Sequence, residues 1–367
     1  MKIRSGIGLR RAGFAAALTL GLLAGTAASA ATMVYVSNAD SKEIYVLTLD
    51  NKSGAVTLVD KVPVTGTVMP LALSPNHRYL YASLRSAPFS VSSFAIDQAT
   101  GRLELLSTVP LADNMAYLST DKTGRFLFGA SYTGDRISVN PIGAQGFVQP
   151  QPIDVIPTRK NAHSIVTDPS NSYVFASNLG GDIILQYKLD PISGHLTPNA
   201  TPFVETKPGA GPRHILFHPN GRFVYATNEL DGTVNTYKFD PAAGTLTLLT
   251  STSAVPAGFK GDAPATSDLH ATPDGRFLYV AERTSSTLAA YRVDGETGAL
   301  TLIGNYATET QPRGFNIDPR GRFLLAVGQK SNGMTAYAIN QETGALAPLK
   351  HYEMGRNPNW VEIVDIP

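Results

Sequence analysis

The stretch GAGPRHILFHPNGRFVYATNE, residues 209–229, reads as a loop, a short apolar strand, a tight turn and a second strand. The Pro, Asn and Gly of the turn separate two runs rich in β-branched and aromatic residues, a pattern that predicts two paired strands. Arg213 precedes the first strand and Glu229 follows the second. The segment is therefore both a structural unit and a candidate chemical site.

The same pattern recurs along the chain. Six copies are spaced 47, 47, 50, 54 and 46 residues apart, with their turns at Pro75, Lys122, Pro169, Pro219, Pro273 and Pro319. Each copy continues with a polar turn, an alternating strand, a turn ending in Gly and a strand that begins Leu-Thr-Leu at Leu246 and Leu300. Four short strands in a unit of this length, repeated around a ring, predict an all-β propeller.

The two ends of the mature chain complete a seventh unit. Residues 33–62 match the second, third and fourth strands of a unit, whereas residues 356–364 match a first strand with nothing after it. We therefore predict a seven-bladed β-propeller with four-stranded blades over residues 31–367, closed by a blade shared between the ends. Such sharing pairs two edges that would otherwise be exposed. Trp360 is expected to pack in this closure.

Residues 1–30 have the three parts of a secretory signal peptide. A start with four Lys or Arg precedes an apolar run at 12–23 and the small residues Ala28-Ser29-Ala30. The apolar run is shorter than the roughly 20 residues that span a bilayer. Phe14 stands one residue late for the twin-arginine pattern, so ordinary secretion is favoured. We expect a periplasmic or secreted protein, with no membrane association after cleavage.

Charge and composition exclude several functions. Residues 1–30 hold four positive charges and no negative ones, so their removal takes the formal net charge from +1 to −3. This balance argues against nucleic-acid binding. Cysteine is absent, which excludes disulfides, thiolate metal sites and a cysteine nucleophile. Neither zinc-ligand spacing nor a glycine-rich phosphate loop is present, so we expect no metal and no cofactor. We also expect the protein to be a monomer.

Two positions in the repeat could carry chemistry. The position six residues before each turn holds Met69, Ala116, His163, Arg213, Ser267, Arg313 and, in the shared unit, Asn359. The position ten residues after each turn holds Arg85, Tyr132, Leu179, Glu229, Arg283 and Gln329.

If both positions face one end of the central channel, their charged side chains converge there. Several arginines around one carboxylate favour an anionic small molecule, and Glu229 or His163 could then move a proton. We assign substrate binding to Arg313, Gln329, His214 and Arg85. For any one of these residues alone, capping of strand ends or pairing between blades is the competing interpretation.

The chain resembles the seven-bladed propeller lactonases of the bacterial 6-phosphogluconolactonase type, to which fungal carboxy-muconate cyclases are related. The resemblance rests on GAGPRHILFHPNGRFVYATNEL, SDLHATPDGRFLYVAERT and TETQPRGFNIDPRGRFLLAVGQKS. It implies hydrolysis or formation of a lactone without a required metal. It also implies functional roles for His163, Arg213, Glu229 and Arg283.

One feature departs from that family. Its named substrate is a phosphorylated sugar lactone of the cytoplasm, whereas this chain has an export signal. We therefore expect an exported, 6-phosphogluconolactonase-like enzyme that hydrolyses a sugar-acid lactone, with unphosphorylated aldonolactones as candidate substrates beside the phosphorylated lactone. Two alternatives are a non-catalytic propeller that binds an anionic ligand or a protein partner, and a muconate-type cyclase.

Overall fold

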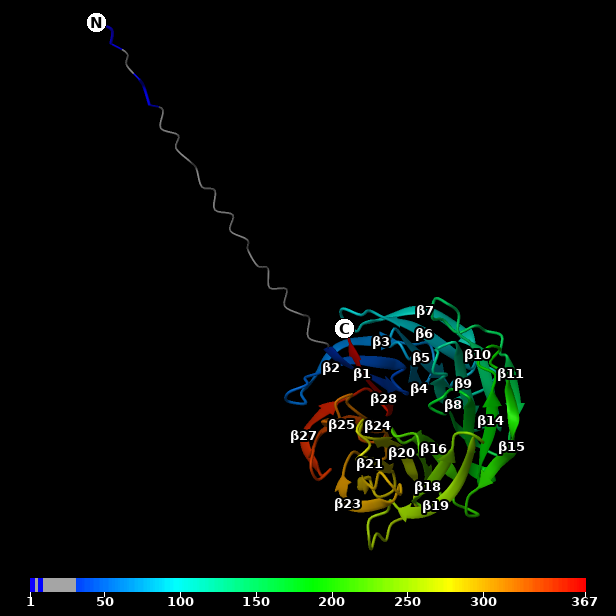
Figure 1. The fold of residues 1–367 in the computed structure, drawn as a ribbon. Helices are drawn as coiled ribbons and strands as arrows, with labels where there is room; N and C mark the ends of the chain where they lie inside the picture. Colours follow the sequence, from blue (N-terminus) through cyan, green and yellow to red (C-terminus); the bar gives the residue numbers. More distant parts are fainter. Residues whose placement is uncertain (4–5, 9–30) are drawn as a thin grey trace.

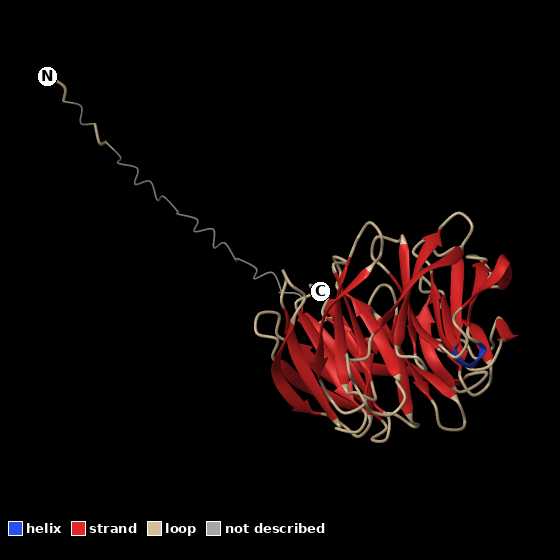
Figure 2. Ribbon diagram, turned by 90° about the horizontal axis from the view of Figure 1, so that it is seen from below, coloured by secondary structure: helices blue, strands red, loops and turns tan. Residues whose placement is uncertain are grey.

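The computed structural model describes residues 1–3, 6–8 and 31–367, so nearly all of the predicted signal peptide lies outside the described residues. Residues 31–367 form seven four-stranded antiparallel sheets around a central channel, with loops on the two faces of the disc (Figures 1 and 2). The predicted β-propeller is thereby confirmed. The one helical element among the described residues is a short 3-10 turn, η1 (Leu179–Gly181), and no described helix is long and apolar enough to cross a membrane.

In every sheet one strand lines the channel and the other three follow outward in order. Four of the sheets contain β28 (Pro358–Ile366), β1 (Ala31–Asn38), β2 (Glu43–Leu49) and β3 (Val56–Pro63); β4 (Val68–Leu73), β5 (Tyr79–Leu84), β6 (Ser90–Ile96) and β7 (Leu103–Pro110); β8 (Met115–Thr120), β9 (Phe126–Ser131), β10 (Arg136–Pro141) and β11 (Asp154–Pro157); and β12 (Ala162–Thr167), β13 (Tyr173–Asn178), β14 (Ile183–Leu189) and β15 (Leu196–Glu205). The other three contain β16 (Pro212–Phe217), β17 (Phe223–Asn228), β18 (Thr233–Asp240) and β19 (Thr245–Ser253); β20 (Thr266–Ala271), β21 (Phe277–Glu282), β22 (Thr287–Val293) and β23 (Leu300–Ala307); and β24 (Pro312–Ile317), β25 (Phe323–Gly328), β26 (Gly333–Ile339) and β27 (Leu346–Glu353).

The ring closes where the two ends of the chain meet. Strand β28 pairs antiparallel with β1 along its whole length, from Ala31 opposite Ile366 to Asn38 opposite Pro358. The shared blade is thus confirmed. The closure is also apolar, because Val364 and Ile366 are buried in the same cluster as Met33. Pairing and burial together satisfy the two edges that the chain ends would otherwise expose.

Repeated tyrosines join neighbouring blades. Each stands in the second strand of its blade and donates its hydroxyl, over 2.8–3.0 Å, to a glycine carbonyl in an outer turn of the next blade; the pairs are Tyr35–Gly101, Tyr81–Gly146, Tyr225–Gly298 and Tyr279–Gly344. Gly344 has a φ of +76°, and a Cβ there would lie 2.3 Å from Phe277. A buried hydroxyl without a partner costs about 1–3 kcal/mol. A shift of one blade against the next would break these hydrogen bonds, so they help to hold adjacent blades in place.

A β-bulge interrupts the start of every innermost strand. The residue six positions before each turn falls within the bulge in all seven blades, for example Ala116 between the paired residues Met115 and Tyr117. A bulge places an extra residue against one partner and changes the direction of its side chain. Hydroxyls of adjacent blades accommodate the irregular backbone: Ser177 Oγ donates to the carbonyl of Arg213 over 2.5 Å.

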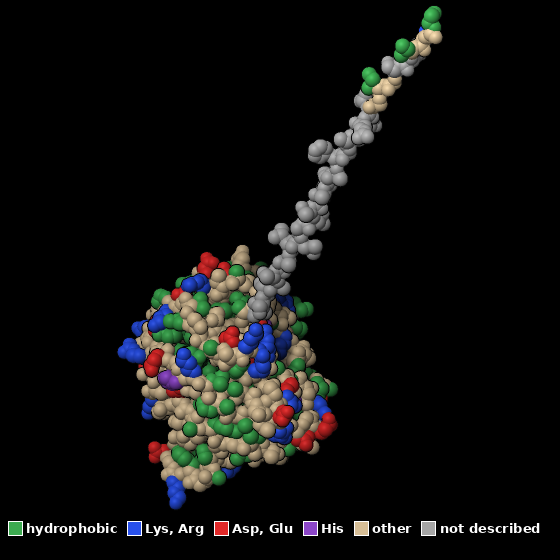
Figure 3. All heavy atoms as spheres, turned by 90° about the vertical axis from the view of Figure 1, so that its left-hand side faces the viewer, with side chains coloured by type: hydrophobic (Ala, Val, Ile, Leu, Met, Phe, Trp, Pro, Cys, Tyr) green, Lys and Arg blue, Asp and Glu red, His purple; other side chains and the backbone are tan. Residues whose placement is uncertain are grey.

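The outer surface carries charges of both signs. Figure 3 shows basic and acidic side chains interspersed over one face. Exposed ion pairs such as Arg102–Asp60 and Arg222–Glu296 belong to this surface. Pairs of this kind contribute little to stability, so the apolar clusters between the sheets carry most of it.

Candidate active site

Arg213 is the most deeply buried charge at one end of the channel. It lies in the bulge of β16, and its side chain is fully buried. Its Nε is 2.8 Å from Glu229 Oε2, and its Nη1 donates to the carbonyl of Ser267 over 2.5 Å. Its Nη2 has no hydrogen-bond partner among the described residues. Burial lowers the pKa of Arg213 to about 10, so the guanidinium is still charged at neutral pH.

Glu229 holds two arginines with one oxygen. It follows β17, and its Oε2 lies 2.8 Å from Arg213 Nε and 2.9 Å from Arg283 Nη2. Arg283 is itself fixed because its Nε donates to the carbonyl of Ala265 over 3.0 Å. Burial disfavours the carboxylate, but the charges of Arg213 and Arg283 outweigh burial and lower the pKa of Glu229. Glu229 is therefore ionised at neutral pH, and its Oε1 makes no ion pair within residues 31–367.

Arg313 provides a positive charge without a counter-ion. It lies in the bulge of β24 and forms no ion pair in the described part of the chain. Burial and the neighbouring Arg213 and Arg283 lower its pKa well below the ordinary value. A desolvated guanidinium among other cations is stabilised by an anion, because an anion supplies the missing negative charge.

His163 is buried and neutral. It lies in the bulge of β12, with its ring 5.8 Å from that of Tyr132 in an edge contact. Burial and the charge of Arg213 lower its pKa far below that of a free imidazole. Its Nδ1 has no hydrogen-bond partner among the described residues. The residue lines the cavity described below.

These side chains surround a single cavity of about 170 Å³. Its lining residues are Arg85, Ala116, Tyr132, His163, Glu229, Arg283 and Arg313. The volume suits a compact ligand, and the lining charge is positive overall. The structure therefore forms a small anion-accepting cavity at the end of the channel that the sequence indicated.

Most of the predicted site residues line this cavity, but three do not. Arg213 pairs with Glu229, yet its side chain is fully buried and does not line the cavity. Gln329 begins the turn after β25, and its Nε2 donates to Asn357 Oδ1 over 2.9 Å, so it does not line the cavity. His214 shares the bulge of Arg213 but faces a second cavity further along the channel. Tyr132 does line the arginine cavity; it stands at one of the two repeat positions, but it carries no charge and was therefore not selected from the sequence.

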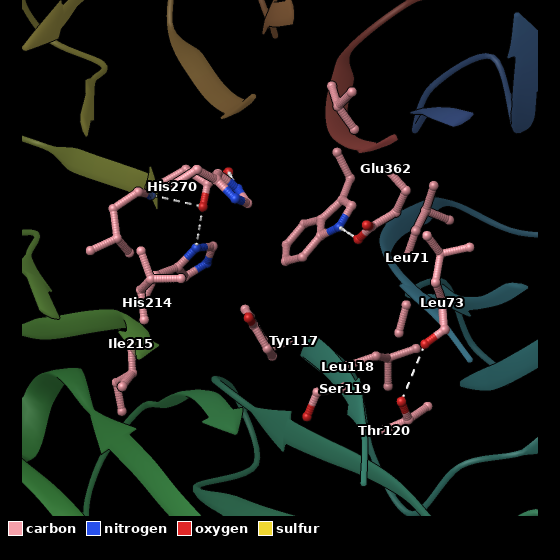
Figure 4. Close-up of a pocket in the computed structure, with 16 residues that line it drawn as sticks. Leu71, Leu73, Tyr117, Leu118, Ser119, Thr120, His214, Ile215, His270 and Glu362 are labelled. Atoms are coloured by element: carbon pink, nitrogen blue, oxygen red, sulfur yellow. Dashed lines mark hydrogen bonds and ion pairs between the residues drawn. The ribbon is translucent and has the colours of Figure 1, made fainter. Parts of the chain in front are cut away.

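The second cavity has a volume of about 310 Å³ and is shown in Figure 4. His214 Nδ1 lies 2.8 Å from Asp268 Oδ1, and His270 Nε2 lies 3.4 Å from Asp268 Oδ2. On another wall, Trp360 Nε1 donates to Glu362 Oε1 over 2.9 Å. This cavity was not predicted from the sequence. Trp360 does belong to the closing strand, as expected, but it also lines the channel.

Metal binding finds no geometric support in residues 31–367. Among the described residues, no group of three or more His, Asp or Glu side chains has an arrangement that could hold a metal ion. Asp268 and His270, two residues apart on β20, pair with each other, and Asp268 also pairs with His214.

Comparisons with known proteins agree with this architecture. A family model described as "Lactonase, 7-bladed beta-propeller" matches residues 22–363. Two proteins named 6-phosphogluconolactonase each match over 286 residues and 78% of this chain. The one from Pectobacterium carotovorum is 44% identical, with 84% of its length covered, and the one from Serratia proteamaculans is 41% identical, with 85% covered.

Solved structures give the same result. The periplasmic gluconolactonase of Pseudomonas aeruginosa superposes with a TM-score of 0.86 at 30% identity, covering 92% of this chain and 100% of its own. With the propeller, its shared blade and the arginine-lined cavity in place, the chain belongs to the seven-bladed β-propeller lactonase family of carboxylic ester hydrolases.

Proposed function

We propose that this protein is an exported lactonase that hydrolyses an unphosphorylated sugar-acid lactone. The observation that carries the proposal is a small cavity lined by Arg283, Arg313 and the ionised Glu229, whose carboxylate also pairs with the buried Arg213. The 6-phosphogluconolactonases among its relatives and the periplasmic gluconolactonase among its structural neighbours support the reaction class. The signal-peptide pattern of residues 1–30 supports export and thus an unphosphorylated substrate.

The charge of the cavity fits the reaction better than it fits the ground state of such a lactone. An unphosphorylated lactone is neutral, but its carbonyl oxygen becomes negative when water attacks, and the product is a carboxylate. Arginines fixed in advance around that oxygen stabilise the transition state more than the substrate. Arg283 and Arg313 line the cavity and are the candidates for this contact.

Glu229 is the candidate general base. Its Oε2 holds the two arginines, which leaves Oε1 to accept a proton from the attacking water. The water oxygen bonds to the lactone carbonyl carbon, and the intermediate then collapses by breaking the ring C–O bond. The ring oxygen leaves as a hydroxyl after taking a proton, and the new acid ionises. His163, which burial holds neutral, lines the cavity and is the candidate to position the substrate.

The test is acid release by purified residues 31–367. Gluconolactone, its 6-phosphate and a muconolactone are followed at constant pH, with and without a chelator. We expect release above the spontaneous rate with the unphosphorylated sugar lactone. Binding without turnover would favour the binding propeller, and ring closure would favour the cyclase.

A pair of arginine variants assigns the reaction to the cavity. Arg283→Ala removes one guanidinium from the site, and we expect a loss of about 10²-fold in kcat/KM. Arg276→Ala is the matched control, because that arginine is half exposed and pairs with Asp274 on the surface. Equal rates in the two variants on every lactone that the parent opens would refute the assignment.

A further inference from the structure

Three rings divide the channel into two cavities. Tyr117 of β8, His214 of β16 and Trp360 of β28 contact one another, with centroid separations of 5.0, 5.4 and 5.6 Å. The three strands belong to three different blades that are not adjacent, so the rings meet across the channel. Ala116, directly before Tyr117, lines the arginine cavity. The cavity of Figure 4 therefore lies on the other side of this ring layer.

Asp268 has its acceptor capacity filled by the protein. Its two oxygens receive His214 Nδ1 at 2.8 Å, His270 Nε2 at 3.4 Å, and the backbone N–H groups of Leu269 at 3.0 Å and Phe315 at 3.2 Å. Four contacts match the lone pairs of one carboxylate. Asp268 thus organises the wall of the cavity and has nothing left to offer a ligand.

His214 has one open acceptor. Because the ionised Asp268 can only accept, the hydrogen of His214 lies on Nδ1, and Nε2 keeps its lone pair. The residue is 2% exposed, it lines the cavity, and its Nε2 has no partner among the described residues. A buried acceptor without a donor is costly, so an O–H or N–H group that reaches this nitrogen from the cavity is stabilising.

Glu362 gives a second acceptor across the cavity, as Figure 4 shows. Its Oε1 accepts from Trp360 Nε1, while its Oε2 makes no hydrogen bond within residues 31–367. Burial raises the pKa of Glu362 to about 7, so this carboxyl is partly protonated at neutral pH. The two open positions, on His214 and Glu362, therefore both take a donor, and the second can also give one.

The rest of the lining sets the chemistry of the occupant. Leu71, Leu73 and Leu118 form an apolar wall, and Ser119 and Thr120 add hydroxyls. No lysine or arginine lines the cavity, and His270 is paired with Asp268, so an anion finds no unpaired counter-charge. A cation is disfavoured for two reasons. Glu362, the lining carboxylate outside an ion pair, is partly protonated, and Asp268 is already paired with His214 and His270. A neutral ring with several hydroxyls satisfies the acceptors and covers the apolar wall.

We propose that this cavity is a second binding site, for a neutral polyhydroxylated ring of monosaccharide size. The volume of about 310 Å³ stands at the lower end of the range for small-molecule sites. The inference does not rest on the proposed function, because the arginine cavity and this one share no lining residue.

Trp360 provides a built-in reporter, because it is the one tryptophan of the chain and its ring lines the cavity. Purified residues 31–367 are titrated with D-glucose, D-xylose and myo-inositol, and with gluconate and choline as an anion and a cation. We expect a saturable change in tryptophan fluorescence and a heat of binding with at least one neutral ring. Gluconate and choline are expected to leave the fluorescence unchanged.

Variants locate the binding. Glu362→Gln is expected to weaken binding about tenfold by calorimetry, because it replaces a charge-assisted acceptor. Leu73→Phe fills the cavity from the apolar wall and tests the site without altering a polar group. Glu104→Gln, on an exposed strand, is the matched control. The proposal is overturned if no neutral ring binds, if choline or gluconate binds and Glu362→Gln abolishes that binding, or if Leu73→Phe binds like the parent.

Discussion

Replacing Glu229 by Gln tests the most concentrated charge arrangement in the molecule. The change keeps the shape of the side chain but removes the negative charge that lies 2.8 Å from Arg213 Nε and 2.9 Å from Arg283 Nη2. The Arg213 side chain is 1% exposed, so water cannot replace the lost partner. Breaking a buried ion pair by removing one member costs about 3–5 kcal/mol. We expect the free energy of unfolding to fall by about that amount.

The same substitution removes the proposed base. We expect kcat to fall about 10²-fold or more, since proton transfer by a positioned group contributes about 10²–10⁴-fold. Urea unfolding gives the stability, and acid release at a temperature well below unfolding gives the rate. Asp60→Asn is the control for stability, because it breaks an exposed pair with Arg102, worth less than about 1 kcal/mol. If Glu229→Gln unfolds like this control, Arg213 has another counter-charge and the reasoning is wrong.

Three further predictions concern pH and export. Since its arginine neighbours lower the pKa of Glu229, the lactonase rate corrected for spontaneous opening should decline only at a lower pH than an ordinary glutamate would cause; a decline already at pH 6 would contradict Glu229 as the base. His214 has a pKa of about 4 in the fold, below its ordinary 6.5, so its contribution to stability is complete above pH 6.5 and is lost as the pH falls towards 4. That loss amounts to about 3 kcal/mol, and urea unfolding at pH 7 and pH 4 measures it; equal stability at both would contradict a neutral His214. Expression of the full chain in a bacterial host should yield a periplasmic protein whose N-terminus, by mass spectrometry, is Ala31; an intact Met1 in the cytoplasm would refute export.

The fold could be predicted from the sequence because the propeller repeats its local signals. The turn at Pro219 and its equivalents, the alternating strands and the matching chain ends each specify one step of a blade, and short-range patterns suffice to count the blades. The place of the arginine cavity could be predicted from the same repeat. Equivalent positions in a closed ring face one point, so a census by repeat position brought Arg213 and Arg283 together.

The second cavity was missed because the census covered only two positions of the repeat. Its polar and aromatic members stand at two others: Tyr117, His214, Asp268 and Trp360 lie five residues before the turn of their unit, and His270 and Glu362 lie three residues before it. That consecutive residues of one strand both reach the channel depends on the bulge, which the sequence pattern alone did not indicate. The prediction for Gln329 was wrong for a similar reason, because a turn after β25 directs its amide to Asn357.

The bulge explains how one repeat supports two sites. In β16 the residues Arg213 and His214 together oppose Thr227, so consecutive side chains both reach the channel. The first joins the arginine cluster and the second lines the cavity beyond the ring layer. Ala116 and Tyr117 divide in the same way between the two cavities. A strictly alternating strand would direct one of each pair away from the channel. The irregularity in the pleat therefore allows a single innermost strand to contribute to both sites.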